Sequence, residues 1–312
     1  TVLLYSHTLQ AQTAPITEIE QLTMPGTTNT LPFYWQGDTV NGKWEPHSAM
    51  LIPVKLNHCA KQFYMQFDLG APNSIFYKNK LAAIQEKYPG AIPLGEPAGK
   101  LTQFTFRAGK TSIQAKEIAV KQFDSSTINW RHKKSIEIIG TIGADLVNGK
   151  VAIIDYPNRK LTISETIPEK LLAKLTLTEL VYMHKKILIP ATINGRETVL
   201  YFDTGSSMFS LLTDKKTAES LSVAGSVAVQ SRVRSWNRVL TANSLPTNDS
   251  IVICNTSIPI RYVTHIEGAS KAQVEQMMKL GIGGMTGNKL FLEYQLVLDT
   301  KNKRMGIVTA QK

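Results

Sequence analysis

Val199-Leu200-Tyr201-Phe202-Asp203-Thr204-Gly205-Ser206-Ser207 is the stretch of sequence that decides the fold. Its first four residues are apolar or aromatic and predict a strand that ends at Asp203, with Tyr201 and Phe202 as core strand residues. Gly205 permits a tight turn beside the carboxylate, and the small side chains of Thr204 and Ser206 can hydrogen-bond it. The stretch therefore predicts a strand that delivers a carboxylate to a tight loop.

An earlier part of the chain repeats this pattern. Leu51-Ile52-Pro53-Val54-Lys55-Leu56-Asn57 resembles Leu188-Ile189-Pro190-Ala191-Thr192-Ile193-Asn194, and an apolar strand ending in an aspartate follows each. In the first copy this stretch is Phe67-Asp68-Leu69-Gly70-Ala71. From each aspartate the copies run without a gap for 22 residues to a glycine, Gly90 or Gly225. Such self-similarity indicates two homologous units.

The later parts of the two copies also match. Gly143 lies 12 residues before Asp155, and Gly287 lies 12 residues before Asp299. Both aspartates end short apolar runs and precede turn formers, so we interpret them as turn residues. Asp145, two residues after Gly143, is expected at the surface. Short helices are predicted at residues 79–88, 214–222 and 270–280.

These observations predict a mainly β fold of two homologous β lobes, related by an approximate two-fold axis and carrying a few short helices. The expected divisions are residues 1–20 as a signal-peptide remnant and tail, 21–48 as an entry segment or short propeptide, 49–165 as the N-terminal lobe, 166–180 as a linker, and 181–312 as the C-terminal lobe.

Two such loops related by a two-fold axis would bring two carboxylates face to face. At roughly 3 Å separation they cannot both ionise, so they share one proton. One carboxylate can then deprotonate a water while the other protonates a substrate carbonyl. The pair Asp68 and Asp203 is therefore suited to hydrolysing an amide bond without a metal ion or a covalent intermediate.

The residues now assembled resemble the pepsin-like and retropepsin-like aspartic proteases. Residues 199–207 match the catalytic loop of that family, and residues 287–299 look like the pepsin segment that closes the second lobe. Ile142-Gly143 resembles the element that crosses behind the first catalytic loop. The resemblance covers most of residues 49–312. It implies an aspartic endopeptidase that acts on polypeptides without a cofactor, with catalytic residues Asp68 and Asp203 supported by Gly70, Ala71, Thr204, Gly205 and Ser206.

The first loop departs from the family pattern. It has Leu69 where the family has threonine, and the family's two facing threonine hydroxyls bridge the loops. Ala71 is not a departure, because retropepsins have alanine there. Met285-Thr286-Gly287 puts a polar residue in the element behind the second loop. The family's flap tyrosine is not evident, and Phe106 is the nearest candidate for a flap aromatic, with core packing as the competing interpretation.

Composition excludes several other classes. The net charge is +11, but the basic residues are spread along the chain without interleaved stacking aromatics, so no nucleic-acid partner is expected. The sequence contains no run of eighteen apolar residues, so no transmembrane helix is expected. The six histidines have no metal-binding spacing, so no metal site is expected. The two cysteines, Cys59 and Cys254, could form one disulfide bond or remain as two free thiols, and the sequence leaves both alternatives open. One chain supplies both lobes, which favours a monomer.

The first residues suggest where the protein acts. Val2-Leu3-Leu4-Tyr5 followed by a polar stretch looks like the end of a secretory signal peptide, cleaved after Ala11, which predicts a secreted or periplasmic protein. Two alternatives to an active endopeptidase remain. One is a protease-like module that binds extended peptides and has weakened or lost catalysis, and the other is a basic binder of an anionic polymer. Leu69 separates the first of these from the enzyme.

Overall fold

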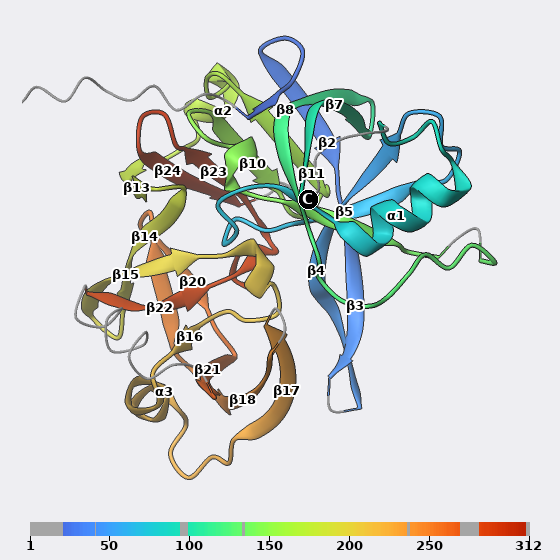
Figure 1. The fold of residues 1–312 in the computed structure, drawn as a ribbon. Coiled ribbons are helices and arrows are strands. Elements are labelled where there is room, and N and C mark those ends of the chain that lie inside the picture. The colour runs from blue at the N-terminus through green and yellow to red at the C-terminus, as the bar shows by residue number, and fades with distance from the viewer. Residues whose placement is uncertain are drawn as a thin grey trace, which may run out of the picture.

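The computed structural model describes residues 21–40, 42–93, 99–132, 135–235, 238–268 and 281–309. The expected signal-peptide remnant at residues 1–20 and the helix predicted at residues 270–280 lie outside the described residues. The chain folds into two β lobes joined by a shared sheet, with the first lobe at the upper right of Figure 1 and the second at the lower left.

The first lobe is built on an eight-stranded sheet, in which seven strands run in the order β1-β8-β6-β9-β5-β4-β3 and β7 pairs with β4 and β8. Its elements are β1 (Leu22–Thr23), β3 (Tyr34–Val40), β4 (Lys43–Leu56), β5 (Phe63–Phe67), β6 (Ile75–Tyr77), α1 (Lys78–Lys87), β7 (Lys100–Ala108), β8 (Thr111–Lys121), β9 (Ile138–Ile142) and the 3-10 helix η1 (Ala144–Leu146).

The second lobe is built on a ten-stranded sheet in the order β17-β18-β21-β16-β22-β15-β14-β19-β20, with β13 paired to β14. Its elements are β13 (Val181–Met183), β14 (Lys186–Ile193), β15 (Arg196–Phe202), the 3-10 helix η2 (Thr204–Ser206), β16 (Leu212–Thr213), α3 (Lys215–Leu221), β17 (Val229–Ser235), β18 (Arg238–Pro246), β19 (Ser250–Ile253), β20 (Thr256–Pro259), β21 (Tyr262–Glu267), β22 (Ile282–Thr286) and the 3-10 helix η3 (Asn288–Phe291).

A six-stranded sheet joins the lobes in the order β12-β24-β23-β10-β11-β2. At its centre β10 and β23 pair antiparallel, with Ile153 opposite Val297, so each lobe contributes a strand to this junction. Its elements are β2 (Thr28–Pro32), β10 (Val151–Asp155), β11 (Lys160–Ser164), β12 (Thr178–Glu179), β23 (Tyr294–Asp299) and β24 (Arg304–Thr309), and the short helix α2 (Glu169–Leu172) lies in the connection between the lobes.

The mainly β, two-lobed fold is thus confirmed, and the alternation of residues explains its sheets. Along β5, residues Phe63, Met65 and Phe67 are fully buried while Tyr64 and Gln66 on the other face are partly exposed, as the two-residue period of a strand requires. The helices predicted at 79–88 and 214–222 are confirmed as α1 and α3. Asp214 caps α3 by accepting a hydrogen bond from the Thr217 backbone N–H at 3.1 Å.

The two lobes also use the same turn after the junction strands. The Asn158 backbone N–H donates to Asp155 Oδ1 at 3.1 Å, and the Asn302 backbone N–H donates to Asp299 Oδ1 at 2.9 Å. In both turns the asparagine side chain also donates to both oxygens of the aspartate. The interpretation of Asp155 and Asp299 as turn residues agrees with this geometry.

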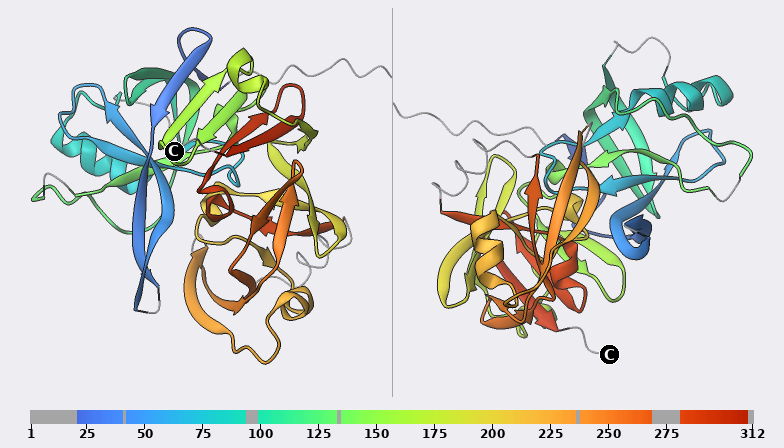
Figure 2. Two further views of the ribbon diagram at one scale, coloured as in Figure 1. Left: turned by 180° about the vertical axis from the view of Figure 1, so that it is seen from behind. Right: turned by 90° about the horizontal axis from the view of Figure 1, so that it is seen from below.

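Residues 21–48 are an integral part of the folded chain. They supply β1, β2, β3 and the first part of β4, and Leu22, Leu31 and Phe33 are each at most 3% exposed. Strand β2 pairs with β11 at the edge of the shared sheet. The long β3–β4 hairpin projects from the first lobe and runs alongside the second (Figures 1 and 2).

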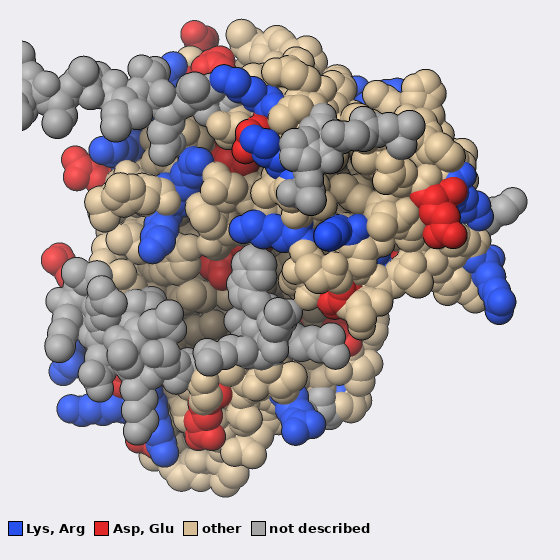
Figure 3. Space-filling view, viewed as in Figure 1, with Lys and Arg blue, Asp and Glu red and all other residues tan. Residues whose placement is uncertain are grey.

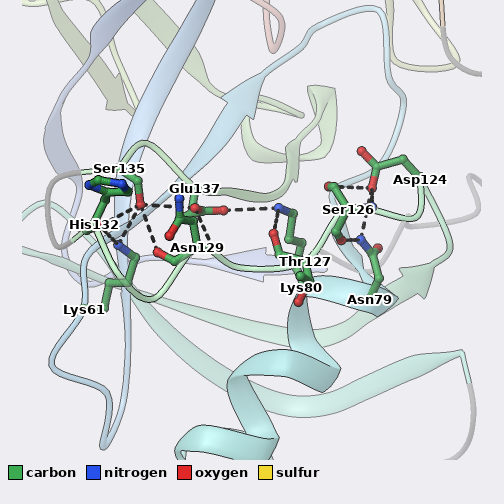
Figure 4. Close-up of polar contacts among 10 residues, drawn as sticks. All are labelled: Lys61, Asn79, Lys80, Asp124, Ser126, Thr127, Asn129, His132, Ser135 and Glu137. Atoms are coloured by element: carbon green, nitrogen blue, oxygen red, sulfur yellow. Dashed lines mark hydrogen bonds and ion pairs between the residues drawn. The ribbon is translucent and has the colours of Figure 1, made fainter.

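A polar network fixes the long connection between β8 and β9 (Figure 4). Glu137 forms a buried ion pair with Lys80 of α1, with the Lys80 Nζ 3.2 Å from Glu137 Oε2. Its other oxygen accepts hydrogen bonds from the Asn129 backbone N–H at 2.9 Å and from the Ser135 hydroxyl at 3.1 Å. Because both Glu137 oxygens are satisfied, the charge can be buried at this position.

Both cysteines, Cys59 and Cys254, are buried free thiols, so the disulfide alternative does not hold. Among the helices that the structure describes, none is long and apolar enough to cross a membrane. On the face seen in Figure 3, basic side chains are scattered over both lobes with acidic side chains between them, and no single basic surface gathers there.

Candidate active site

The two aspartates lie at equivalent ends of strands. Strand β5 runs parallel to β9 and ends beside Asp68, whose backbone N–H donates to the Ile142 carbonyl at 2.9 Å. Strand β15 runs parallel to β22 and ends beside Asp203, whose backbone N–H donates to the Thr286 carbonyl at 2.9 Å. Each carboxyl group is therefore held at the carboxyl end of a central strand by a neighbouring parallel strand.

The structure brings the two carboxyl groups together. The Gly70 backbone N–H is 2.9 Å from Asp68 Oδ1 and 3.1 Å from Asp203 Oδ1, so one donor is shared between the lobes. The charge of Asp203 is also close enough to Asp68 to raise the pKa of the Asp68 carboxyl group. Two carboxyl groups this close hold a proton between them, because placing two negative charges in such contact is unfavourable.

Glycine is required in both loops by the opposite carboxyl group. A Cβ atom at Gly70 would lie 2.5 Å from Asp203 Cγ, and a Cβ atom at Gly205 would lie 2.6 Å from Asp68 Oδ1. Both distances are shorter than any real contact of a Cβ atom. The two glycines thus allow each loop to approach the aspartate of the other lobe.

The two carboxyl groups differ in the donors that reach them. Asp203 accepts from the Gly205 backbone N–H at 2.7 Å and from the Ser206 hydroxyl at 2.9 Å. Within its own loop, as far as the structure describes the chain, Asp68 accepts from backbone groups alone, the N–H of Gly70 and, at 3.2 Å, the N–H of Ala71. Alanine has no hydroxyl to offer, so the site is asymmetric although its backbone is nearly symmetric.

This environment raises the pKa of Asp68 to about 7. Burial is the largest cause, followed by the charge of Asp203 and the hydrogen bond with its side chain, while the Gly70 and Ala71 N–H groups act in the opposite direction. Burial and the neighbouring Asp203 thus favour the protonated form of Asp68.

The Thr204 hydroxyl forms hydrogen bonds from the second lobe to the first. Leu69, at the equivalent position of the first loop, has no hydroxyl to form such bonds in the other direction. The Thr204 hydroxyl accepts from the Leu69 backbone N–H at 2.8 Å and donates to the Phe67 carbonyl at 2.9 Å. Both Thr204 and Leu69 are 0% exposed, and the Leu69 side chain belongs to the hydrophobic core. The first loop is thus held by a hydroxyl of the second lobe, without the reciprocal hydroxyl from position 69.

Polar residues behind the loops were missed by the sequence analysis. Asp145, expected at the surface, is partly buried and accepts from the Ser74 backbone N–H at 2.8 Å and from its hydroxyl at 2.7 Å. On the other side, the Asn288 side chain donates to the Thr204 carbonyl at 2.9 Å and to the Ser207 hydroxyl at 3.0 Å. Asp145 lies two residues after Gly143, in η1, and Asn288 directly follows Gly287, in η3. Their closeness to the repeated glycines is the signal in the sequence that could have identified them.

The structure places Phe106 in the hydrophobic core. Phe106 lies in β7, is 0% exposed, and packs its ring edge-to-face against Phe76 at 5.5 Å between centroids. The end of its hairpin is directed at Pro32 and Pro53 rather than at the carboxyl groups, since the Gly109 backbone N–H donates to the Pro53 carbonyl at 3.1 Å. A residue packed in the core cannot act as a flap aromatic, so Phe106 does not belong to the site.

A different hairpin of the first lobe contacts the loop that carries Asp203. The Ser207 hydroxyl donates to the carbonyl of His47 in β4 at 2.7 Å. Lys289 in η3 forms an ion pair with Glu45, which also lies in β4. Burial lowers the pKa of His47, with Glu45 acting in the opposite direction. The β3–β4 hairpin therefore reaches across from its own lobe and is fastened beside the loop that carries Asp203.

Comparison with solved structures identifies the fold. No family model matches the sequence, and no curated protein matches it. Among solved structures, the chain is similar to an aspartic proteinase from Irpex lacteus, with a TM-score of 0.53 and 14% identity over 91% of this chain and 98% of that chain. It is also similar to the basic 7S globulin from soybean, with a TM-score of 0.48 and 10% identity over 92% of this chain and 96% of that chain. At these identities the similarity shows the fold alone.

Proposed function

We propose that the protein is an aspartic-type endopeptidase, in which Asp68 and Asp203 activate a water molecule for the hydrolysis of peptide bonds. The observation that carries this proposal is the Gly70 N–H shared between Asp68 Oδ1 and Asp203 Oδ1. The fold similarity to an aspartic proteinase supports the same conclusion. One chain supplies both carboxyl groups, so the proposed enzyme works as a monomer.

The unequal donors assign different roles to the two carboxyl groups. Asp203, with the Ser206 hydroxyl and the Gly205 N–H, is the ionised member and takes a proton from the attacking water. Asp68, whose pKa is raised, donates its proton to the carbonyl oxygen of the substrate. A neutral tetrahedral intermediate with two hydroxyls forms. The proton on Asp203 then passes to the amide nitrogen as the carbon–nitrogen bond breaks, and Asp68 recovers its proton from a hydroxyl of the intermediate.

The pH dependence follows from these roles. Asp68 must be protonated, and its pKa of about 7 keeps it so throughout the acidic range. Activity is therefore expected at acidic pH, with a decline as the pH rises through about 7 and Asp68 ionises. Unfolded polypeptides are the expected substrates. A secreted or periplasmic location, expected from residues 1–12, is part of this proposal.

The test is cleavage of a reduced, alkylated protein between pH 3 and pH 8, followed by mass spectrometry of the products. Asp68→Asn and Asp203→Asn are expected to abolish cleavage while leaving the circular dichroism spectrum intact. Asp155→Asn is the matched control, because Asp155 lies in a turn and takes no part in the pair. Retained cleavage in Asp203→Asn would remove the pair from the mechanism.

A second candidate function is a protease-like module that binds extended peptides and has weakened or no catalysis. The observation that favours it is the fully buried Leu69, which offers no hydroxyl to the opposite loop. This function is the better one if the wild-type protein and Leu69→Thr show no turnover at any pH while both bind extended peptides.

A further inference from the structure

Tyr201 is a polar side chain beside the pair that the reaction described above does not use. It lies in β15, two residues before Asp203. Its neighbours Leu200 and Phe202 are fully buried, whereas Tyr201 points from the other face of the strand and remains partly exposed. Its apolar neighbours in the sequence predict a core strand residue, whereas the structure places its hydroxyl at the loop that carries Asp68.

The Tyr201 hydroxyl donates to the Gly70 carbonyl at 3.2 Å, a hydrogen bond from the second lobe to the first. This carbonyl belongs to the same peptide unit as the Ala71 N–H, which donates to Asp68 Oδ1 at 3.2 Å. Hydrogen bonds in series polarise one another, so a donor on the carbonyl strengthens the N–H on the other side of the unit. Tyr201 is thereby connected to Asp68 through a single peptide unit.

The first loop depends on this bond because its own side chains provide little cross-lobe support. Leu69 has no hydroxyl, and Ala71 has none to give to Asp68. Besides Tyr201, the bonds that the structure describes from the second lobe to residues 67–71 involve two groups. The Thr204 hydroxyl holds the Leu69 N–H and the Phe67 carbonyl, and the Asp203 carboxylate accepts from the Gly70 N–H. Neither the Thr204 hydroxyl nor the Asp203 carboxylate bonds the Gly70 carbonyl, which is the group that Tyr201 reaches.

We propose that Tyr201 is a positioning residue, which fixes the Gly70–Ala71 peptide unit against Asp68 and so compensates for the hydroxyl that Leu69 lacks. This inference rests on the proposed peptidase function. Burial and the charges of Asp203 and Asp68 raise the pKa of Tyr201, so its hydroxyl remains a donor throughout the range in which the pair works.

Removing the hydroxyl should affect the chemical step and the titration of Asp68. In Tyr201→Phe the peptide unit is less firmly held, and kcat is expected to fall about tenfold with KM within about twofold of wild type. The weaker Ala71 N–H stabilises the Asp68 carboxylate less, so the alkaline limb of the pH profile is expected to move to higher pH. In the Leu69→Thr/Tyr201→Phe double variant a hydroxyl returns to the first loop, and the loss of kcat caused by Tyr201→Phe should be smaller than in the wild-type background.

The experiment compares these variants with Tyr182→Phe. The Tyr182 hydroxyl donates to Asn148 Oδ1 at 2.8 Å, so this control also removes a tyrosine hydroxyl bond, but one away from the pair. Steady-state kinetics across pH is combined with an NMR titration of aspartate carboxyl carbons, assigned with Asp68→Asn. A shift of the Asp68 titration in Tyr201→Phe but not in Tyr182→Phe is expected.

The NMR titration separates this inference from the proposed function. A protein without turnover in which Tyr201→Phe still shifts the Asp68 titration would overturn the peptidase and keep Tyr201 as a positioning residue. An unchanged Asp68 titration and pH profile in Tyr201→Phe would overturn the inference. An equal loss of kcat in Tyr182→Phe would also overturn it, since the effect would then be a general loss of stability.

Discussion

Replacing Asp68 with asparagine should make the protein more stable at neutral and alkaline pH, even though it destroys the proposed activity. The pKa of Asp68 rises from 3.8 to about 7 on folding. Between these two values the folded protein binds more protons than the unfolded chain, so its stability falls as the pH rises through this window. Above pH 7 the folded protein must hold an ionised carboxyl group that burial and Asp203 disfavour.

The size of this effect follows from the shift. Each pKa unit corresponds to about 1.4 kcal/mol, so a shift of about three units gives an upper limit of roughly 4 kcal/mol at pH 8. Asparagine keeps the shape of the side chain without the charge, and we expect Asp68→Asn to recover about 2–4 kcal/mol. A chain of this length has an unfolding entropy near 0.65 kcal/mol/K, so the expected rise in Tm is about 3–6 °C.

Thermal unfolding followed by circular dichroism at pH 4, 6 and 8 measures this prediction. The gain in Tm of Asp68→Asn over wild type should be near zero at pH 4 and largest at pH 8. Asp155→Asn is the control, because it changes a turn aspartate outside the pair, and no gain that grows with pH is expected from it. A gain in Asp68→Asn that is equal at pH 4 and pH 8, or absent at pH 8, would refute the reasoning.

Three further substitutions test other parts of the site and its support. Leu69→Thr should raise turnover and lower the free energy of unfolding by about 1–3 kcal/mol, because a hydroxyl replaces apolar volume at a fully buried position; unchanged kinetics would show that the missing hydroxyl does not limit the pair. Gly205→Ala should abolish turnover, because its Cβ would meet Asp68 Oδ1, whereas Gly90→Ala, whose Cβ would lie 3.6 Å from the nearest atom, should retain it in the same cleavage assay. Lys80→Met should cost about 3–5 kcal/mol in urea unfolding by leaving Glu137 buried and unpaired, and the added change Glu137→Gln should recover part of that loss; an equal loss in both variants would contradict this account.

The parts of the fold that short sequence patterns govern were predictable. Apolar runs predicted the strands before Asp68 and Asp203, and a short segment that ends near a glycine predicted α3. The repeated motif also predicted that both aspartates lie in loops, and the structure brings those loops together through the shared Gly70 N–H. These features depend on a few adjacent residues, and for that reason they could be read directly from the sequence.

Other contacts depend on pairings between distant segments and could not be read in this way. Strand β2 pairs Leu31 with Leu161, and nothing in residues 28–32 specifies that partner. The burial of Asp145 depends on its partner Ser74, which lies 71 positions away in the chain, so the residues around Asp145 do not indicate it. The same limit applies to Tyr201, because an aromatic residue beside a strand end usually packs in the core, and only the fold shows that its hydroxyl meets the Gly70 carbonyl.

The pairing of β10 with β23 at the middle of the shared sheet has a consequence for the assembly of the site. A separated half of the chain would expose one of these strands as a bare sheet edge, with backbone donors and acceptors unpaired. Such an edge favours pairing of the half with a second copy of itself in a symmetric dimer. The amount of that dimer would fall as the halves are diluted. In the intact protein the connection through α2 makes this association intramolecular, with an effective concentration on the order of millimolar. The two aspartates therefore meet at any dilution of the protein.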